Sequence, residues 1–232
     1  MNKPICLQEQ VKTLELLLLE KQSSLSKHQS LRIHRALSWL KASLEYQSDL
    51  DICFINLWIS FSSLLKTASA GQTLQDFSAF IIKQDEEQKI YQFLFEEYAN
   101  KISVLIKNPF VYPVFWQALQ AEQTEQGTDF SNMSWRKSFE QESVAALNAL
   151  SRRNSAELLD IVLSRLAVLQ QQILDGGATW QSRVNRKQLK DAVELLLQLT
   201  PLLVDVMIRA EEDWQAVAYP VVDQSLLSSL KA

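Results

Sequence analysis

Residues 49–66 decide the fold class, and they read Asp-Leu-Asp-Ile-Cys-Phe-Ile-Asn-Leu-Trp-Ile-Ser-Phe-Ser-Ser-Leu-Leu-Lys. The apolar side chains follow one another so closely that a helix over these residues is apolar nearly all round. Such a helix belongs in the centre of a bundle, because it must be covered on every side. We therefore expect residues 49–66 to form the central core helix of an all-α protein.

The preceding segment predicts an amphipathic helix. From Ile33 on, apolar side chains recur at spacings of four, three and four, which places them on one helical face. They are Ile33, Leu37, Leu40 and Leu44, and the charged side chains Arg32, Arg35, Lys41 and Glu45 fall on the other side.

The composition supports a helical bundle. Only 4 Gly and 5 Pro occur in 232 residues, too few for the tight turns of a β-sandwich or barrel. A hydrophobic fraction of 47% is enough for a core that needs no disulfide or metal. We expect one domain over residues 1–232, a bundle of about eight or nine helices. Its centre would hold the helices around Phe54–Leu65, Leu158–Ile173 and Leu189–Met207.

Capping residues and helix breakers predict several boundaries. Thr73 with Asp76 can begin a helix as an N-cap and an acidic first-turn residue. A long amphipathic stretch covers residues 86–107. Gly176-Gly177 ends a helix where the chain must enter left-handed geometry. Pro201 should bend or split the last long helix, because it removes a backbone donor and clashes with the preceding turn.

Charge and hydropathy exclude some classes of partner. A net charge of -4 gives no overall attraction to nucleic-acid phosphates or to anionic lipid. The sequence carries no secretory signal, and its apolar runs fall well short of the roughly 20 residues that cross a bilayer. We expect a soluble cytoplasmic protein that does not enter membranes. Cys6 and Cys53 lie in hydrophobic stretches, so reduced core side chains are expected rather than a disulfide.

Few residues are suited to metal or cofactor chemistry. His28 and His34 are the only histidines, and no Cys pair has ligand spacing. The sequence has no glycine-rich phosphate loop. We expect no metal and no cofactor. His34 lies one residue from the apolar series of its helix, so it is either a partly exposed structural side chain or a catalytic base.

A basic cluster follows Gly176-Gly177. Its members are Trp180, Arg183, Arg186, Lys187 and Lys190, and they lead into a new helix. Basic side chains beside free backbone N–H groups can hold an anion, and an indole can stack on a base. In the alternative, the cluster is a solvated first turn with Trp180 folded onto the core. The candidates for RNA or anion binding are therefore Trp180, Arg183, Arg186 and Lys187.

The same region carries a family resemblance. The segment from Arg165 to Trp180 ends in Asp-Gly-Gly-Ala-Thr-Trp, and Ser182-Arg-Val-Asn-Arg186 follows it. This segment resembles the signature of the HEPN superfamily, in particular its larger members with a His-Gly-Gly-Ala-Thr-Trp ending. Further similar segments are Arg35-Ala-Leu-Ser-Trp-Leu-Lys41, residues 49–61, Asn108-Pro-Phe110 with Phe115-Trp116, and Trp214 with Tyr219-Pro-Val-Val-Asp223. The resemblance covers residues 30–223.

The resemblance implies a helical bundle, commonly a dimer, and often a metal-independent ribonuclease of toxin–antitoxin or phage-defence systems. In that family an Arg and a His near a helix end act together: the imidazole moves a proton and the guanidinium stabilises negative charge. This sequence has Gln170 in place of the Arg and Asp175 in place of the His. Gln170 has no charge to offer, and an ionised Asp175 would repel a phosphate.

Two hypotheses follow for the function. The first is a catalytically degenerate HEPN-like protein that acts through protein or RNA binding and forms a homodimer. The alternative is an active metal-independent endoribonuclease that uses other residues. For that enzyme, His34 and Arg35 are the only neighbouring His–Arg pair.

Overall fold

The computed structural model describes residues 6–69, 71–124, 134–183 and 186–222. This part of the chain is all-α, as predicted, with ten α-helices and one antiparallel bridge between Thr67 and Val217. The helices are α1 (Leu7–Lys21), α2 (Lys27–Glu45), α3 (Leu50–Leu65), α4 (Leu74–Gln84), α5 (Lys89–Gln92), α6 (Ala99–Ile106), α7 (Pro113–Thr124), α8 (Ser134–Arg152), α9 (Ser155–Leu174) and α10 (Arg186–Arg209). No described helix is both long and apolar enough to cross a bilayer.

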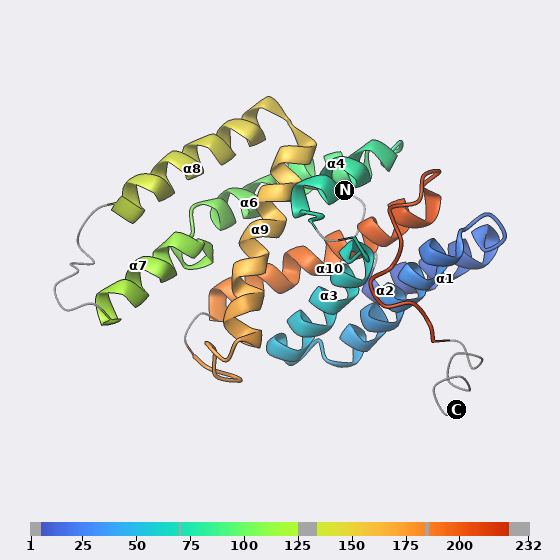
Figure 1. The fold of residues 1–232 in the computed structure, drawn as a ribbon, viewed down its shortest axis with the longest axis horizontal. Helices are drawn as coiled ribbons and strands as arrows, with labels where there is room; N and C mark the ends of the chain where they lie inside the picture. The colour runs from blue at the N-terminus through green and yellow to red at the C-terminus, as the bar shows by residue number, and fades with distance from the viewer. Residues whose placement is uncertain (1–5, 70, 125–133, 184–185, 223–232) are drawn as a thin grey trace.

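The helix α3 lies in the core, as the sequence predicts. It packs on α2 and α10, while α9 packs on α4 and α8 (Figure 1). Phe54, Leu57 and Phe61 are almost completely buried in one cluster with side chains of α9 and α10. At one end of the molecule α7 and α8 run side by side, and α1 and α2 lie at the other (Figure 1).

The number of helices exceeds the eight or nine expected, because the stretch 86–107 is not one helix. It divides into α5, a π-helical turn over Phe93–Glu97 and α6. In the π-turn the N–H of Tyr98 bonds to the carbonyl of Phe93, five residues back, so the helical register shifts there.

Caps and breakers act mostly as predicted. Thr73 and Asp76 form a reciprocal capping box at the start of α4. The α9 helix ends at Leu174, and Gly176 follows with a φ of 79°. The prediction for Pro201 is wrong as far as splitting is concerned, because α10 runs through it as one helix.

The two cysteines differ. Cys53 is buried, as expected, and burial raises the pKa of its thiol to about 11. Cys6 is exposed at the N-terminal end of α1, so its predicted place in the core is wrong. Both are free thiols.

A second correction concerns Arg32, which the helical pattern places on the side of its helix away from the apolar face. Its side chain is fully buried. The guanidinium donates to the carbonyl oxygens of Leu64 and Lys66, where α3 ends, at 2.6 and 2.8 Å. It also donates to the carbonyl oxygen of Gln215 at 2.8 Å. Arg32 thereby joins α2, the end of α3 and residues 210–222, which we call the C-terminal strap.

The strap covers the end of the core. The indole N–H of Trp214 bonds to the carbonyl of Leu65, and its ring packs on Phe77 and Phe80. Burial lowers the pKa of Arg32 to about 10, against the opposing influence of Asp213, so the guanidinium stays charged at neutral pH.

Candidate functional site

The residues that the sequence singles out fall into two regions of the molecule. Trp180, Arg183, Arg186 and Lys187 lie near the degenerate motif positions, at the corner where α9 ends and α10 begins. His34 and Arg35 lie on α2. We call these regions the α9–α10 corner and the α1–α2 groove.

The corner is held to the N-terminus of α3 by two aspartates. Asp49 caps α3, because its Oδ1 accepts hydrogen bonds from the N–H groups of Asp51 and Ile52. Its other oxygen, Oδ2, accepts the indole N–H of Trp180 at 2.9 Å. One carboxylate thus begins a helix and fixes a loop that lies 131 residues further along the chain.

The electrostatics of Asp49 reflect these bonds. Partial desolvation works against its charged form, but the hydrogen bonds from Trp180, Ile52, Gln181 and Asp51 outweigh it. The pKa of the Asp49 carboxyl therefore lies below its usual value.

Asp51 holds the other side of the corner. Its Oδ2 accepts a charged hydrogen bond from Nη1 of Arg186 at 2.6 Å and one from the backbone N–H of Gln181 at 3.2 Å. Gln181 has a φ of 53°, and its contacts with Asp49 and Asp51 hold this left-handed conformation. Arg186 is thus half-buried and paired with Asp51, whereas the other basic residues of the cluster, Arg183, Lys187 and Lys190, are exposed.

Trp180 matches neither of its two predicted arrangements fully. The ring is 63% exposed, so it is not folded onto the core, yet its N–H is bound to Asp49. A pocket of about 230 Å³ lies beside it, between the end of α9 and the start of α10. The residues that line it include Asp51, Gln172, Thr179 and Arg186.

The degenerate motif positions sit at the end of α9. Gln170 is half-buried, and Asp175 is the exposed C-cap residue of the helix. An acid at this end opposes the helix dipole. With Asp49, Asp51 and Asp175 nearby, the corner carries acids as well as bases.

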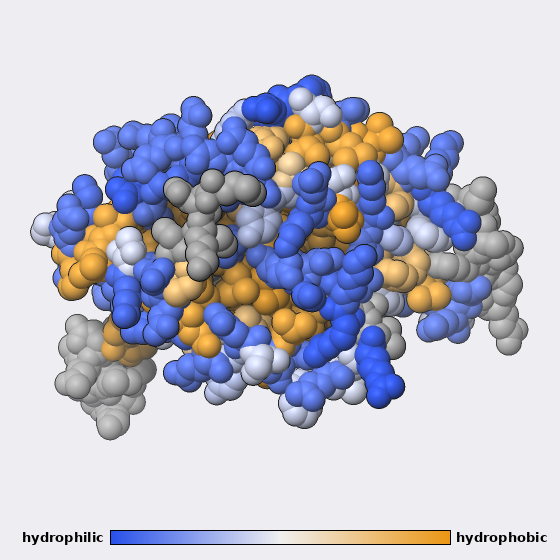
Figure 2. Space-filling model, turned by 180° about the vertical axis from the view of Figure 1, so that it is seen from behind, coloured by the Kyte–Doolittle hydropathy of each residue, from blue (hydrophilic) through white to orange (hydrophobic). Residues whose placement is uncertain are grey.

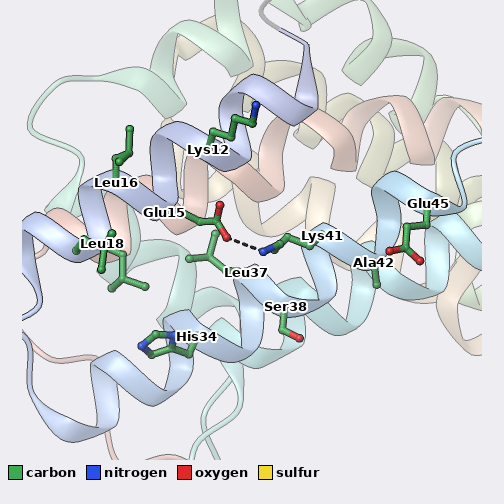
Figure 3. A pocket seen from close by; sticks show the side chains of 11 residues that line it. Lys12, Glu15, Leu16, Leu18, His34, Leu37, Ser38, Lys41, Ala42 and Glu45 are labelled. Atoms are coloured by element: carbon green, nitrogen blue, oxygen red, sulfur yellow. Dashed lines mark hydrogen bonds and ion pairs between the residues drawn. The ribbon is translucent and has the colours of Figure 1, made fainter.

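The α1–α2 groove is the larger cavity, with a volume of about 830 Å³ (Figure 3). The two helices line it from opposite sides, and Glu15 of α1 bonds to Lys41 of α2 across it at 2.7 Å. Leu18 and Leu37 supply apolar walls, and His34 stands near one end.

Two leucines at the groove are left uncovered. Leu16 is 68% and Leu19 67% exposed, although Leu14, Leu17 and Leu18 of the same helix are buried in the core. Apolar side chains reach the surface at this end of the molecule among hydrophilic ones (Figure 2).

His34 and Arg35 do not converge on one cavity. His34 lines the α1–α2 groove, whereas Arg35 lines a separate pocket with Lys66 and Tyr219. Neighbouring residues on a helix point about 100° apart, which explains the separation. The geometry therefore does not assemble the pair as an acid–base site. Among the described residues no group of three His, Cys, Asp or Glu side chains could hold a metal ion.

The contacts of Asp49 and Asp51 with the α9–α10 corner were not predicted from the sequence. The signal for Asp49 was present, since an aspartate directly before an apolar run is a typical N-cap. The hydrogen bond that Asp49 accepts from Trp180 could not be predicted from the sequence, because the two residues are 131 positions apart.

No family model, no curated protein and no solved structure matches this chain. The resemblance to the HEPN superfamily therefore rests on the quoted sequence segments and remains a prediction.

Proposed function

We propose that this chain is a catalytically degenerate HEPN-like protein that acts by binding, and that its α1–α2 groove binds a second copy of the chain. The observation that carries the proposal is the pair Leu16 and Leu19, each about two-thirds exposed beside an apolar groove. Exposed apolar side chains next to a groove of this size are typical of interaction surfaces. The setting that the resemblance implies is toxin–antitoxin or phage defence.

The charges of α1 favour a second copy as the occupant. Two copies of α1 that cross antiparallel about Leu16 bring Lys12 of one copy opposite Glu20 of the other, twice by symmetry. Both side chains are exposed, and they lie four residues before and after Leu16. A two-fold interface requires such self-complementarity, because the same patch is used on both sides.

The non-catalytic part of the proposal rests on the motif positions. Gln170 and Asp175 can supply neither the fixed positive charge nor the neutral base of the family's chemistry. Each missing group typically costs about 10²–10⁴-fold in rate. We expect no RNA cleavage through this motif.

Self-association tests the binding proposal. Light scattering on a sizing column should give twice the 26.6 kDa chain mass for the unmodified protein and the single mass for the double variant Leu16→Lys, Leu19→Lys. Val144→Lys is the matched control, because Val144 is also an exposed apolar side chain but lies on α8. A monomeric unmodified protein, or equal dissociation by Val144→Lys, would overturn the proposal.

RNA cleavage tests the competing enzyme. Labelled total RNA is incubated with the unmodified protein, with His34→Ala and with Gln170→Arg plus Asp175→His. We expect no cleavage by the unmodified protein. Cleavage by the unmodified protein that His34→Ala abolishes would establish the alternative ribonuclease. Cleavage by the double variant alone would support the proposal that Gln170 and Asp175 have replaced the catalytic residues.

RNA binding at the α9–α10 corner is a second candidate function, favoured by the exposed ring of Trp180 beside Arg183 and Lys187. Base stacking and phosphate contacts would act together there. If this holds, binding of a fluorescent single-stranded RNA weakens with salt and is reduced in Arg183→Ala plus Lys187→Ala. Binding that the double variant leaves unchanged would reject this site.

A further inference from the structure

A third cavity lies away from both regions, where the start of α7 meets α8 and α9. Its volume is about 320 Å³, which is at the small end of the range of about 300–1,000 Å³ for ligand pockets. The lining residues that matter for its chemistry are Tyr112, Glu142, Asp160, Ile161, Ser164 and Arg165.

Arg165 is the unusual side chain of this pocket. It is only 5% exposed, and its guanidinium lies over the rings of Tyr112 and Phe139, at 4.7 and 5.7 Å from their centres. Burial lowers its pKa, while Glu142 and Tyr112 act in the opposite direction. Its Nη2 lies 4.0 Å from Oε2 of Glu142, a long ion pair.

The other terminal nitrogen of Arg165, Nη1, has no hydrogen-bond partner among the described residues. Buried donors in folded proteins are almost always paired, with a protein group, a water molecule or a ligand. A charged donor left unpaired beside a cavity therefore indicates that an acceptor can occupy that cavity.

The acidic side chains restrict what this acceptor can be. Oε1 of Glu142 accepts a hydrogen bond from the hydroxyl group of Tyr112 at 2.7 Å, and the Glu142 side chain is partly exposed. Asp160, on α9, makes no hydrogen bond or ion pair with any described residue, and burial raises its pKa. The pocket lining thus holds two carboxylates and one guanidinium, so the carboxylates repel a simple anion, whereas a simple cation leaves the guanidinium unpaired.

A ligand that carries one negative and one positive group can pair with the guanidinium and with a carboxylate of the pocket at the same time. Asp160 and Arg165 are five residues apart on α9, about 7.5 Å along the helix axis and about 140° around it, and both line the pocket because the arginine side chain leans back toward the N-terminus. We propose that this pocket binds a free α-amino acid, with its carboxylate on Arg165 and its ammonium group on Asp160. Ile161 offers an apolar contact for the side chain of the amino acid.

Isothermal titration tests this proposal with each of the twenty L-α-amino acids. At least one should bind, and its decarboxylated amine and its deaminated acid should each bind at least about tenfold more weakly, the equivalent of one lost ionic contact. Asp160→Asn and Arg165→Gln should each weaken binding by a similar factor. Asp175→Asn is the matched control, because Asp175 is an exposed acid at the far end of the same helix.

Three results would overturn the proposal. The first is that none of the twenty binds, in which case a water molecule pairs with Nη1. The second is that the amine or the acid alone binds as well as the amino acid. The third is that Asp160→Asn, which removes a charge without enlarging the pocket, leaves the affinity unchanged. Thermal unfolding of Arg165→Gln confirms that this variant is folded before its affinity is interpreted.

Discussion

Two arginines are buried in the part of the chain that the structure describes, and they are used in opposite ways. Arg32 donates three hydrogen bonds to main-chain carbonyls from two distant segments. Arg165 rests on two aromatic rings with one long ion pair and an unpaired terminal nitrogen. A guanidinium whose terminal nitrogens are both engaged holds the fold together, whereas one that is half engaged can still accept a ligand.

The surroundings of the two side chains agree with this difference. Arg32 closes the end of the main core, where the C-terminal strap meets α3. Arg165 lies beside a smaller aromatic cluster of Tyr112, Phe115 and Trp135 under α7 and α8, next to an open pocket. The same substitution at both positions therefore separates the structural role of Arg32 from the binding role proposed for Arg165.

The largest expected effect is that of Arg32→Met. The variant leaves the carbonyls of Leu64, Lys66 and Gln215 without their donor, and it should lose about 3–5 kcal/mol of the free energy of unfolding. Urea denaturation followed by circular dichroism measures the loss. Arg35→Met, at the next arginine along α2, should change the stability by less than about 0.5 kcal/mol. If Arg32→Met lowers the free energy of unfolding by less than about 1 kcal/mol, Arg32 does not have the structural role described here.

A smaller effect is expected for Arg165→Met. The variant loses cation–π contacts of about 0.5–2 kcal/mol, but it no longer buries a charge, and methionine fills much of the space. We expect a loss of about 1 kcal/mol in the same denaturation experiment. A loss as large as that of Arg32→Met would mean that the two arginines do not differ as argued.

The smallest effect concerns Asp160, whose pKa is raised by burial from its ordinary 3.8. Between 3.8 and the raised value the folded state binds more protons than the unfolded state, so stability is lost as the pH rises. Asp160→Asn should therefore be more stable than the unmodified protein at pH 7, by less than about 1 kcal/mol because the side chain is partly solvated. The difference should narrow as the pH falls toward 3.8. A variant less stable than the unmodified protein at pH 7 would show that Asp160 has a partner.

The sequence predicted the helical fold well, because periodicity and breakers act locally. The apolar run of residues 49–66 became the buried α3, and the predicted cap Thr73 begins α4. The π-turn at Phe93–Glu97 was missed, because it keeps the amphipathic pattern while it shifts the hydrogen bonds.

The candidate sites were less predictable, because their contacts join distant segments. Arg32 was assigned to the charged side of its helix, although it directly precedes Ile33 on the apolar side of α2. Arg165 lies three residues after Val162 in the apolar series of α9, which in retrospect marks a buried cation. The acceptors of Arg32 and the rings under Arg165 come from other parts of the chain and could not be read from the pattern.

A cysteine cross-link at Leu16 tests the proposed function most directly, because the antiparallel arrangement places this residue on the two-fold axis. The variant is Leu16→Cys in a Cys6→Ser background, where the buried Cys53 is the only other thiol. Val144→Cys in the same background is the control. After mild oxidation, a non-reducing gel should show a band at twice the 26.6 kDa chain mass for Leu16→Cys and little of it for Val144→Cys. No dimer band for Leu16→Cys, or equal bands for both variants, would contradict the proposal that two copies meet through α1.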